Sequence, residues 1–138
     1  MSEKKTERRQ VFDPLRGKYV ALTPEEAVRQ SFIKFLIEKR AWPKTLLMSE
    51  TEIKLGEVRQ RCDIVGYGKS LTPKLIVECK AQSVKITASV FEQIWRYALI
   101  LKVRWLVVTN GVSTYACEYS DEEGKYKYIA DIPYFTED

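Results

Sequence analysis

The pattern of hydrophobic and polar positions along the chain predicts two helices and several short strands. Apolar residues that recur at helical spacing predict helices at residues 23–40 and 87–102. Alternating or continuously apolar runs predict strands, which lie at residues 19–22, 52–55, 59–67, 74–80, 104–109, 112–119 and 125–130. Turn-forming residues separate these segments at 68–73, 110–111 and 121–124, and residues 132–138 form a short tail.

The order of these elements predicts the fold class. Strands 52–55, 59–67 and 74–80 follow one another directly, which favours an antiparallel meander. The helix at 87–102 separates the last of them from strand 104–109, and a strand-helix-strand unit favours parallel pairing. We therefore expect an α/β protein with a mixed central β-sheet flanked by helices, in the order αβββαβ, with extra edge strands.

The helix at residues 23–40 carries signals for both of its ends. Thr23 can serve as its N-cap, Pro24 suits the first helical position, and Glu26 can complete a capping box. Pro43 lies just beyond its expected end. The apolar stripe that should face the core consists of Val28, Phe32, Phe35 and Leu36.

Composition and charge restrict the possible chemistry. The 138 residues include no histidine, which excludes serine-histidine triads and histidine-rich metal sites. The three cysteines have no Cys-x-x-Cys spacing, which argues against a zinc ribbon or a disulfide framework. The net charge of +4 permits a polyanionic partner but does not require one. Any catalysis must therefore rest on carboxylates, lysine or a metal ion.

Length and terminal composition indicate the domain organisation and the location in the cell. We expect one domain at residues 11–138, preceded by a mobile charged tail at residues 1–10. The alternative role for this tail is a phosphate-binding arm. The sequence has neither an apolar run long enough to span a membrane nor an apolar signal segment. We therefore expect a cytoplasmic protein that does not bind a membrane.

Ionisable residues gather on one side of the predicted hairpin. Side chains alternate along strand 74–80, so Glu78 and Lys80 leave one face while the apolar residues between them leave the other. Asp63 lies on the preceding strand, and hairpin pairing can bring it near Glu78. Two carboxylates, a main-chain carbonyl and water molecules form a hard oxygen site, which suits Mg²⁺ better than zinc.

The same residues also allow an ordinary ion-paired surface. Lys80 can neutralise Glu78 and Asp63 can pair with Arg61, which would leave a solvated sheet face without a metal ion. The apolar character of the strand argues for a central position, where charges need a partner or a metal. The residues alone leave both explanations open, because spacing is a weak discriminator.

Several segments together resemble the PD-(D/E)xK nuclease superfamily. They are Arg61-Cys62-Asp63, Pro73-Lys74-Leu75-Ile76-Val77-Glu78-Cys79-Lys80-Ala81 and Gln93-Ile94-Trp95-Arg96-Tyr97. Two further segments resemble the N-terminal nuclease-like domain of type I restriction enzyme R subunits, namely Thr23-Pro24-Glu25-Glu26-Ala27-Val28-Arg29-Gln30 and Thr109-Asn110-Gly111. The similarity covers residues 12–133 and implies a restriction-endonuclease-like core. One departure is Cys62, which stands where the superfamily name has proline.

The resemblance implies roles for the hairpin residues. Asp63 and Glu78 would ligate Mg²⁺, with Mn²⁺ as a substitute, together with the main-chain carbonyl of Cys79. Lys80 would orient the attacking water or help to deprotonate it.

The resemblance also implies that a glutamate of the first helix joins the metal ligands. Helical geometry favours Glu25, which lies near the centre of the apolar stripe, over Glu26. The alternative is that both only stabilise the helix N-terminus electrostatically. Gln93 and Tyr97 share one face of the second helix and resemble the glutamine-tyrosine pair that supports the active site of RecB-like nucleases. Their alternative role is structural, with the tyrosine in the core.

Aromatic and thiol side chains suggest further expectations. Trp42 and Trp95 are candidates for stacking on bases, whereas Trp105 lies in an apolar strand and is expected in the core. Cys62 and Cys79 are expected to face each other beneath the hairpin as small apolar residues.

The leading hypothesis is a Mg²⁺-dependent nuclease-type domain that binds DNA and hydrolyses phosphodiester bonds. A rival hypothesis is a non-catalytic nucleic-acid-binding or assembly module that retains the fold, because the chain has no P-loop and no room for a motor. A third is a structural protein whose polar hairpin face is only solvated. The expected partners are DNA and either a second copy of the chain or a protein that supplies a motor or specificity function.

Overall fold

A mixed six-stranded sheet lies at the centre of the fold, with the strand order β3-β4-β5-β6-β7-β8. The computed structural model describes residues 9–137, without the side chains of Leu55 and Tyr97. The helices and strands are β1 (Gln10–Asp13), β2 (Lys18–Ala21), α2 (Pro24–Lys39), the short 3-10 helix η1 (Lys44–Leu46), β3 (Leu47–Leu55), β4 (Val58–Tyr67), β5 (Pro73–Cys79), α3 (Ala88–Leu101), β6 (Trp105–Thr109), β7 (Thr114–Ser120) and β8 (Lys125–Ile129).

The pairing of these strands confirms the predicted α/β class and the mixed sheet. Strands β3, β4 and β5 form an antiparallel meander, and β5 pairs with β6 in parallel after the crossover through α3. Strands β7 and β8 extend the sheet beyond β6 by antiparallel pairing. The order from α2 to β6 is therefore the predicted αβββαβ, with two extra strands at the edge.

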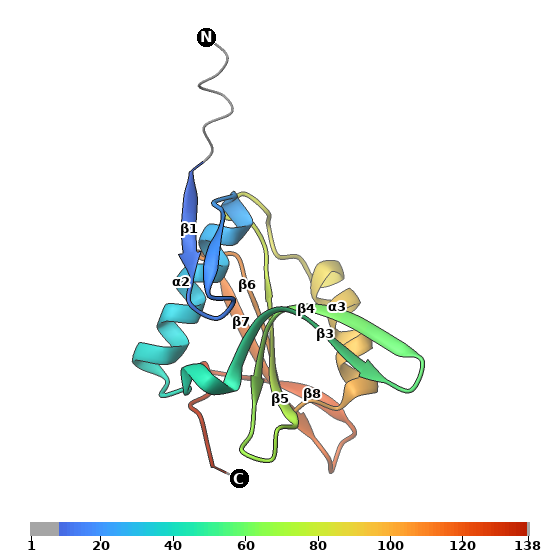
Figure 1. Cartoon of the computed structure of the whole chain (residues 1–138). Helices are drawn as coiled ribbons and strands as arrows, with labels where there is room; N and C mark the ends of the chain where they lie inside the picture. Colours follow the sequence, from blue (N-terminus) through green and yellow to red (C-terminus); the bar gives the residue numbers. More distant parts are fainter. Residues whose placement is uncertain (1–8, 138) are drawn as a thin grey trace.

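The two long helices cover opposite faces of the sheet (Figure 1). Leu36 of α2 and Val77 of β5 belong to one buried cluster, whereas Ala98 of α3 and Ile76 of β5 belong to the other. Strand β5 alternates between the two clusters because successive side chains point to opposite faces. Trp105 is 5% exposed, which confirms the prediction that it lies in the core.

Helix α2 begins largely as its sequence predicts. The Thr23 side-chain oxygen accepts a hydrogen bond from the Glu26 N–H at 3.0 Å, and Pro24 is the first helical residue. The reciprocal half of the predicted capping box is wrong, because the Thr23 N–H donates to the Ala21 carbonyl at 3.1 Å. The Glu26 carboxylate is thereby available for arginine side chains.

The chain before α2 forms a hairpin of which the sequence predicted only the second strand. Strands β1 and β2 pair from Gln10 opposite Ala21 to Asp13 opposite Lys18, and the hairpin stands beside α2 (Figure 1). The tail predicted at residues 1–10 falls mostly on residues 1–8, which lie outside the described part of the chain, and Gln10 is the first residue of β1.

The local geometry of β4 explains why one prediction about the cysteines is wrong. Cys62 packs in the cluster beneath α3, whereas Cys79 packs in the cluster beneath α2, so the two thiols do not face each other. The β3–β4 ladder pairs Ser49 with Ile64 and Thr51 with Cys62, and it skips the position between them. Glu50 has a positive φ of 51° at the skipped position, and this local irregularity interrupts the alternation of side chains although the register is the same on both sides of it.

Trp42 lies in the core, so the expectation that it stacks on bases is wrong. It is 1% exposed, and its indole N–H donates to the Pro133 carbonyl at 3.0 Å. Gly66 lies directly against it, since a Cβ atom at this position would be 2.7 Å from Cζ3 of the indole. The buried Trp42 side chain therefore connects the C-terminal segment, at Pro133, to the sheet, at Gly66.

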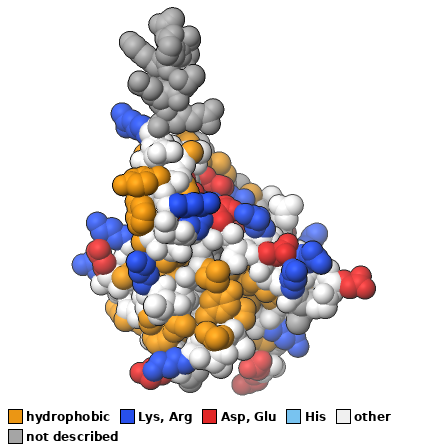
Figure 2. Space-filling view, in the orientation of Figure 1, with side chains coloured by type: hydrophobic (Ala, Val, Ile, Leu, Met, Phe, Trp, Pro, Cys, Tyr) orange, Lys and Arg blue, Asp and Glu red, His pale blue; other side chains and the backbone are white. Residues whose placement is uncertain are grey.

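The surface shown in Figure 2 carries interspersed acidic and basic side chains and a hydrophobic patch near the centre of its lower half. Charges of both signs are therefore close together on this face, in agreement with the small net charge of +4. Within residues 9–137, no helix is long and apolar enough to cross a membrane.

Candidate functional site

Asp63 lies where β4 and β5 separate. The last pair of their ladder on this side joins Ile64 to Val77. Beyond it, the Cys79 N–H donates to Asp63 Oδ2 at 2.7 Å, so a carboxylate takes the position that a strand carbonyl would otherwise fill. The side chain of Asp63 is 15% exposed. This hydrogen bond fixes Asp63 against the end of β5, beside the residues that the sequence singled out.

Glu78 and Lys80 lie at that end of β5. Glu78 is opposite Val108 in the parallel ladder, and the Lys80 N–H donates to the Thr109 carbonyl at 2.8 Å. Both side chains are half-buried, whereas Val77 and Cys79 are buried, as the predicted alternation requires. Lys80 Nζ forms no hydrogen bond or ion pair with any of the described residues.

The thiols beside these carboxylates are kept neutral. Burial raises the pKa of Cys62 to about 12, and the negative charges of Glu78 and Asp63 add to the effect. Burial also raises the pKa of Cys79 well above its ordinary value, with Asp63, Glu78 and Glu25 contributing in the same direction. The charges of all three carboxylates therefore act against ionisation of the Cys79 thiol.

Arg29 is the main partner of Asp63. Its Nη2 donates to Asp63 Oδ1 at 2.8 Å and to Glu50 Oε1 at 2.8 Å. Its Nη1 donates to Glu26 Oε1, and Glu25 Oε1 lies 3.6 Å from Nη2. Burial alone would lower the pKa of Arg29, but the hydrogen bond and the charge of Asp63, with Glu26 and Glu50, raise it. A guanidinium that is 4% exposed therefore lies among four carboxylates.

The ion pair between Asp63 and Arg61, which was the alternative to a metal site, is not formed. Arg61 Nε donates instead to Glu50 Oε2 at 3.0 Å. Glu50 has a positive φ of 51° and occupies the position opposite Asp63 that the β3–β4 ladder skips. Both carboxylates face α2, where Arg29 donates to them.

The arginine contacts continue into the N-terminal hairpin. Arg16 donates two hydrogen bonds to Glu26, at 2.9 and 3.0 Å, and its Nε donates to Asp13. Asp13 is fully buried and also accepts from Ser49 Oγ at 2.7 Å. We call the connected residues the α2 ion-pair network; they are Asp13, Arg16, Glu25, Glu26, Arg29, Glu50, Arg61 and Asp63. Carboxylates outnumber guanidinium groups in it.

The two glutamates at the start of α2 have different environments. Glu26 is 5% exposed and bonded to Arg16, Arg29 and Gln30, because the N-terminal hairpin covers it. The side chain of Glu25, in the first turn of α2, is 49% exposed. Glu25 is therefore accessible for a ligand, whereas Glu26 is already committed to two arginines.

The glutamine-tyrosine pair is only partly described. Gln93 lies on α3, is exposed, and lines a hollow of about 290 Å³ with Ser89, Glu92 and Arg96. The side chain of Tyr97 lies outside the described part of the structure, so the predicted support of the active site by this pair stays a prediction. Trp95 is half-buried on the same helix and packs edge-on against Phe91, with ring centroids 5.8 Å apart.

The donor set has the right chemistry for a hard divalent cation, with one condition. Asp63, Glu78, the Cys79 carbonyl and Glu25 all supply oxygen, which Mg²⁺ prefers. In the described residues, however, no three carboxylate or thiol side chains converge as a metal cluster. Asp63 Oδ1 is held by Arg29. The residues fit Mg²⁺ provided that this guanidinium releases Asp63.

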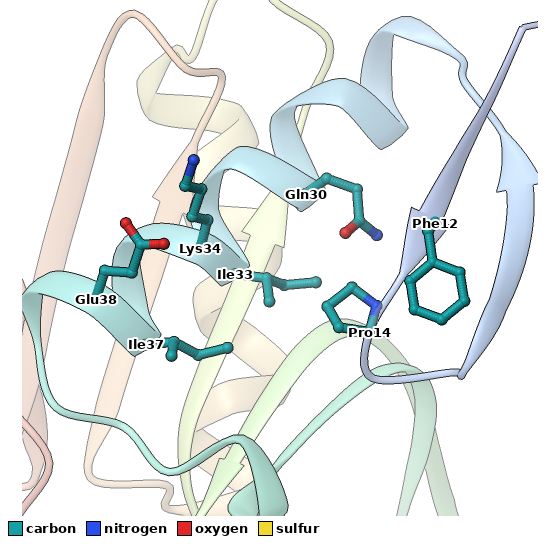
Figure 3. Close-up of a pocket in the computed structure, with 7 residues that line it drawn as sticks. All are labelled: Phe12, Pro14, Gln30, Ile33, Lys34, Ile37 and Glu38. Atoms are coloured by element: carbon teal, nitrogen blue, oxygen red, sulfur yellow. The ribbon is translucent and has the colours of Figure 1, made fainter.

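A larger hollow of about 330 Å³ lies between the N-terminal hairpin and α2 (Figure 3). Phe12 and Pro14 face Ile33 and Ile37 across it, as the close-up shows. None of the predicted site residues lines it, and its lining is mainly apolar. It is therefore separate from the carboxylates at the end of β5.

These features define an α/β domain with a carboxylate-rich site where a central strand pair separates. A family model described as "Type I restriction enzyme R protein N terminus (HSDR_N)" matches residues 24–133, and the chain belongs to this family. The match extends from the start of α2 to Pro133 and so includes the whole central sheet. The sequence matches no curated protein.

Sequence reasoning found the hairpin carboxylates and missed the arginines. Arg29 follows Val28 in α2 and is buried together with Val28 and Phe32 of the apolar stripe. A charged residue on a stripe that faces the core requires buried partners of opposite charge. That signal could have identified Arg29, but not which carboxylates it binds.

Proposed function

We propose that this chain is a Mg²⁺-dependent nuclease-type domain of the PD-(D/E)xK superfamily, with a restriction-endonuclease-like fold, that binds DNA and hydrolyses phosphodiester bonds. Membership of the type I restriction enzyme R protein family supports a restriction-related role. The observation that carries the proposal is the hydrogen bond from the Cys79 N–H to Asp63 Oδ2 at 2.7 Å. It holds the Asp63 carboxylate against Cys79, which lies between Glu78 and Lys80 in the chain.

Each residue of the site has a distinct task in this proposal. Asp63, Glu78 and the Cys79 carbonyl hold the cation, and Glu25 contributes a further carboxylate from α2. Bound there, Mg²⁺ would stabilise negative charge on the phosphoryl oxygens. Lys80, whose amine has no partner among the described residues, orients the water that attacks phosphorus. Gln93 and Tyr97 support the site from α3.

DNA cleavage by matched variants tests this function. We expect the wild-type chain to cut DNA with Mg²⁺ or Mn²⁺, and Asp63→Ala and Lys80→Ala to lose at least about a hundredfold in rate, the usual effect of removing acid-base or charge-stabilising groups. Asp121→Ala and Lys54→Ala are the controls, because both side chains are exposed and lie away from β5. Asp121 is in the turn between β7 and β8, and Lys54 is on the edge strand β3. Equal cleavage by all four variants, or no cleavage of any nucleic acid by the wild type, would refute the enzymatic function.

A second candidate function is a non-catalytic nucleic-acid-binding or assembly module. The observation that favours it is the contact of Arg29 with Asp63 at 2.8 Å, which neutralises the carboxylate without a metal ion. Calorimetric titration separates the two candidates. Absence of Mg²⁺ and Mn²⁺ binding would favour the module, whereas binding that Asp63→Ala abolishes would favour the nuclease.

A further inference from the structure

We infer that Arg29 competes with the divalent cation for Asp63 and so sets the metal affinity of the site. The guanidinium holds Asp63 Oδ1 at 2.8 Å and has to release this oxygen before a cation can bind there. The inference rests on the proposed function, because it concerns the same carboxylate.

The burial of Arg29 makes this competition strong. Its side chain is 4% exposed and that of Asp63 is 15% exposed, so water screens their attraction little. A divalent cation at Asp63 would also lie close to the Arg29 guanidinium, and the two positive charges would repel each other. Arg29 therefore opposes metal binding both by occupying an oxygen and by its charge.

The neighbouring carboxylates give Arg29 other acceptors when it leaves Asp63. Nη1 donates to Glu26, and Nη2, which contacts Asp63, also contacts Glu50 at 2.8 Å and lies 3.6 Å from Glu25. The loss of Asp63 thus leaves the guanidinium charged and still paired, without moving it into solvent. The guanidinium can therefore leave Asp63 Oδ1 and stay paired within the α2 ion-pair network.

The direction of the effect separates this role from a purely structural one. A residue that only holds the site together would weaken metal binding when it is removed. A competing cation would strengthen metal binding when it is removed, provided that the protein stays folded. Metal affinity is therefore the informative measurement, and it does not depend on catalysis.

Arg61 provides a matched control. Arg29 and Arg61 both donate to Glu50, and their removal changes the charge of the network by the same amount. Of these two arginines, only Arg29 contacts Asp63, and the Arg61 side chain is 69% exposed. The comparison of Arg29→Met with Arg61→Met therefore isolates the contact with Asp63 from the general loss of positive charge.

The experiment is a calorimetric titration of Mn²⁺ into the wild-type chain and both variants at equal ionic strength. We expect Arg29→Met to bind about tenfold more tightly or better, equivalent to about 1.4 kcal/mol. Arg61→Met should change the affinity by less than about threefold, because exposed charges act weakly. Addition of Asp63→Asn to Arg29→Met should abolish the gain.

Arg29→Met leaves buried carboxylates without their cation, so circular dichroism is used to verify the fold. If this variant does not fold, Arg29→Met combined with Glu26→Gln takes its place. The double variant keeps the net charge of the network, and Glu26 does not contact Asp63 among the described interactions. The same gain in affinity is expected for it.

The outcomes distinguish this inference from the proposed function. Binding by the wild type that Asp63→Asn abolishes, with unchanged or weaker binding after Arg29 is replaced, would overturn the competition and leave the metal site standing. Binding that appears only after Arg29 is replaced would support the competition in its strongest form. Absence of Mn²⁺ binding in every folded variant would overturn both proposals.

Discussion

Replacement of Asp13 by asparagine should destabilise the protein although Asp13 lies outside the candidate site. Asp13 is fully buried, and its carboxylate accepts hydrogen bonds from the Leu15 N–H at 2.7 Å and from Ser49 Oγ at 2.7 Å. It also pairs with Arg16, which in turn binds Glu26. The change therefore acts at the point where the N-terminal hairpin is attached to β3 and α2.

The magnitude follows from the contacts that asparagine cannot make. The amide oxygen can still accept from the turn, but the amide nitrogen cannot accept from Arg16 or Ser49. Loss of one charge-assisted hydrogen bond and a buried ion-pair partner costs about 2–4 kcal/mol. Arg16 keeps its contacts with Glu26, at 2.9 and 3.0 Å, which limits the cost to the lower part of this range.

The effect should depend on pH with a defined sign. Burial opposes ionisation of Asp13, but the hydrogen bonds from Arg16 and Ser49 outweigh it and lower the pKa of Asp13 below its ordinary 3.8. A carboxyl whose pKa is lower in the folded state stabilises the protein above its unfolded pKa, and this contribution is lost as the pH falls through the folded pKa. The difference between wild type and Asp13→Asn should therefore be constant at neutral pH and shrink below about pH 4.

Urea denaturation of both proteins between pH 7 and pH 3 measures this difference. Asp131→Asn is the matched control, because Asp131 also pairs with an arginine, Arg40, at 2.8 Å but is exposed. The control should have nearly wild-type stability, since exposed ion pairs contribute little. Equal free energies of unfolding for Asp13→Asn and wild type at pH 7 would refute the reasoning, as would a difference that grows with acid.

Two further predictions concern packing and the helix glutamates. Gly66→Ala should lower the free energy of unfolding by about 1–3 kcal/mol, because its Cβ would lie 2.7 Å from the Trp42 ring; an unchanged urea midpoint would contradict the packing. Glu26→Gln should cost about 2–4 kcal/mol because Glu26 is buried among charged partners. Glu25→Gln should leave stability within about 0.5 kcal/mol but weaken Mn²⁺ binding, and unchanged calorimetric affinity would remove Glu25 from the ligands.

Local patterns in the sequence determined the elements and their order. The spacing of apolar residues identified both helices, since one buried stripe follows from helical geometry alone. Thr23 and Thr87 each cap a helix with the side-chain oxygen, which depends only on neighbouring residues. The helix between β5 and β6 favoured their parallel pairing, because parallel strands need a crossover connection of about this length.

Tertiary structure decided the contacts that give the site its character. The sequence placed Asp63 and Glu78 on adjacent strands, but the irregular pairing at Glu50 and Asp63 accompanies an arrangement in which Cys62 and Cys79 lie on opposite faces of the sheet. Arg29 reaches Asp63 across 34 positions of the chain, a contact that no local pattern encodes. Which charges meet depends on strand register and on how α2 lies on the sheet, because both are fixed only when the whole core packs. The residue types of the candidate site could therefore be predicted from the sequence. The contact of the Arg29 guanidinium with Asp63, a candidate metal ligand, depended on the fold.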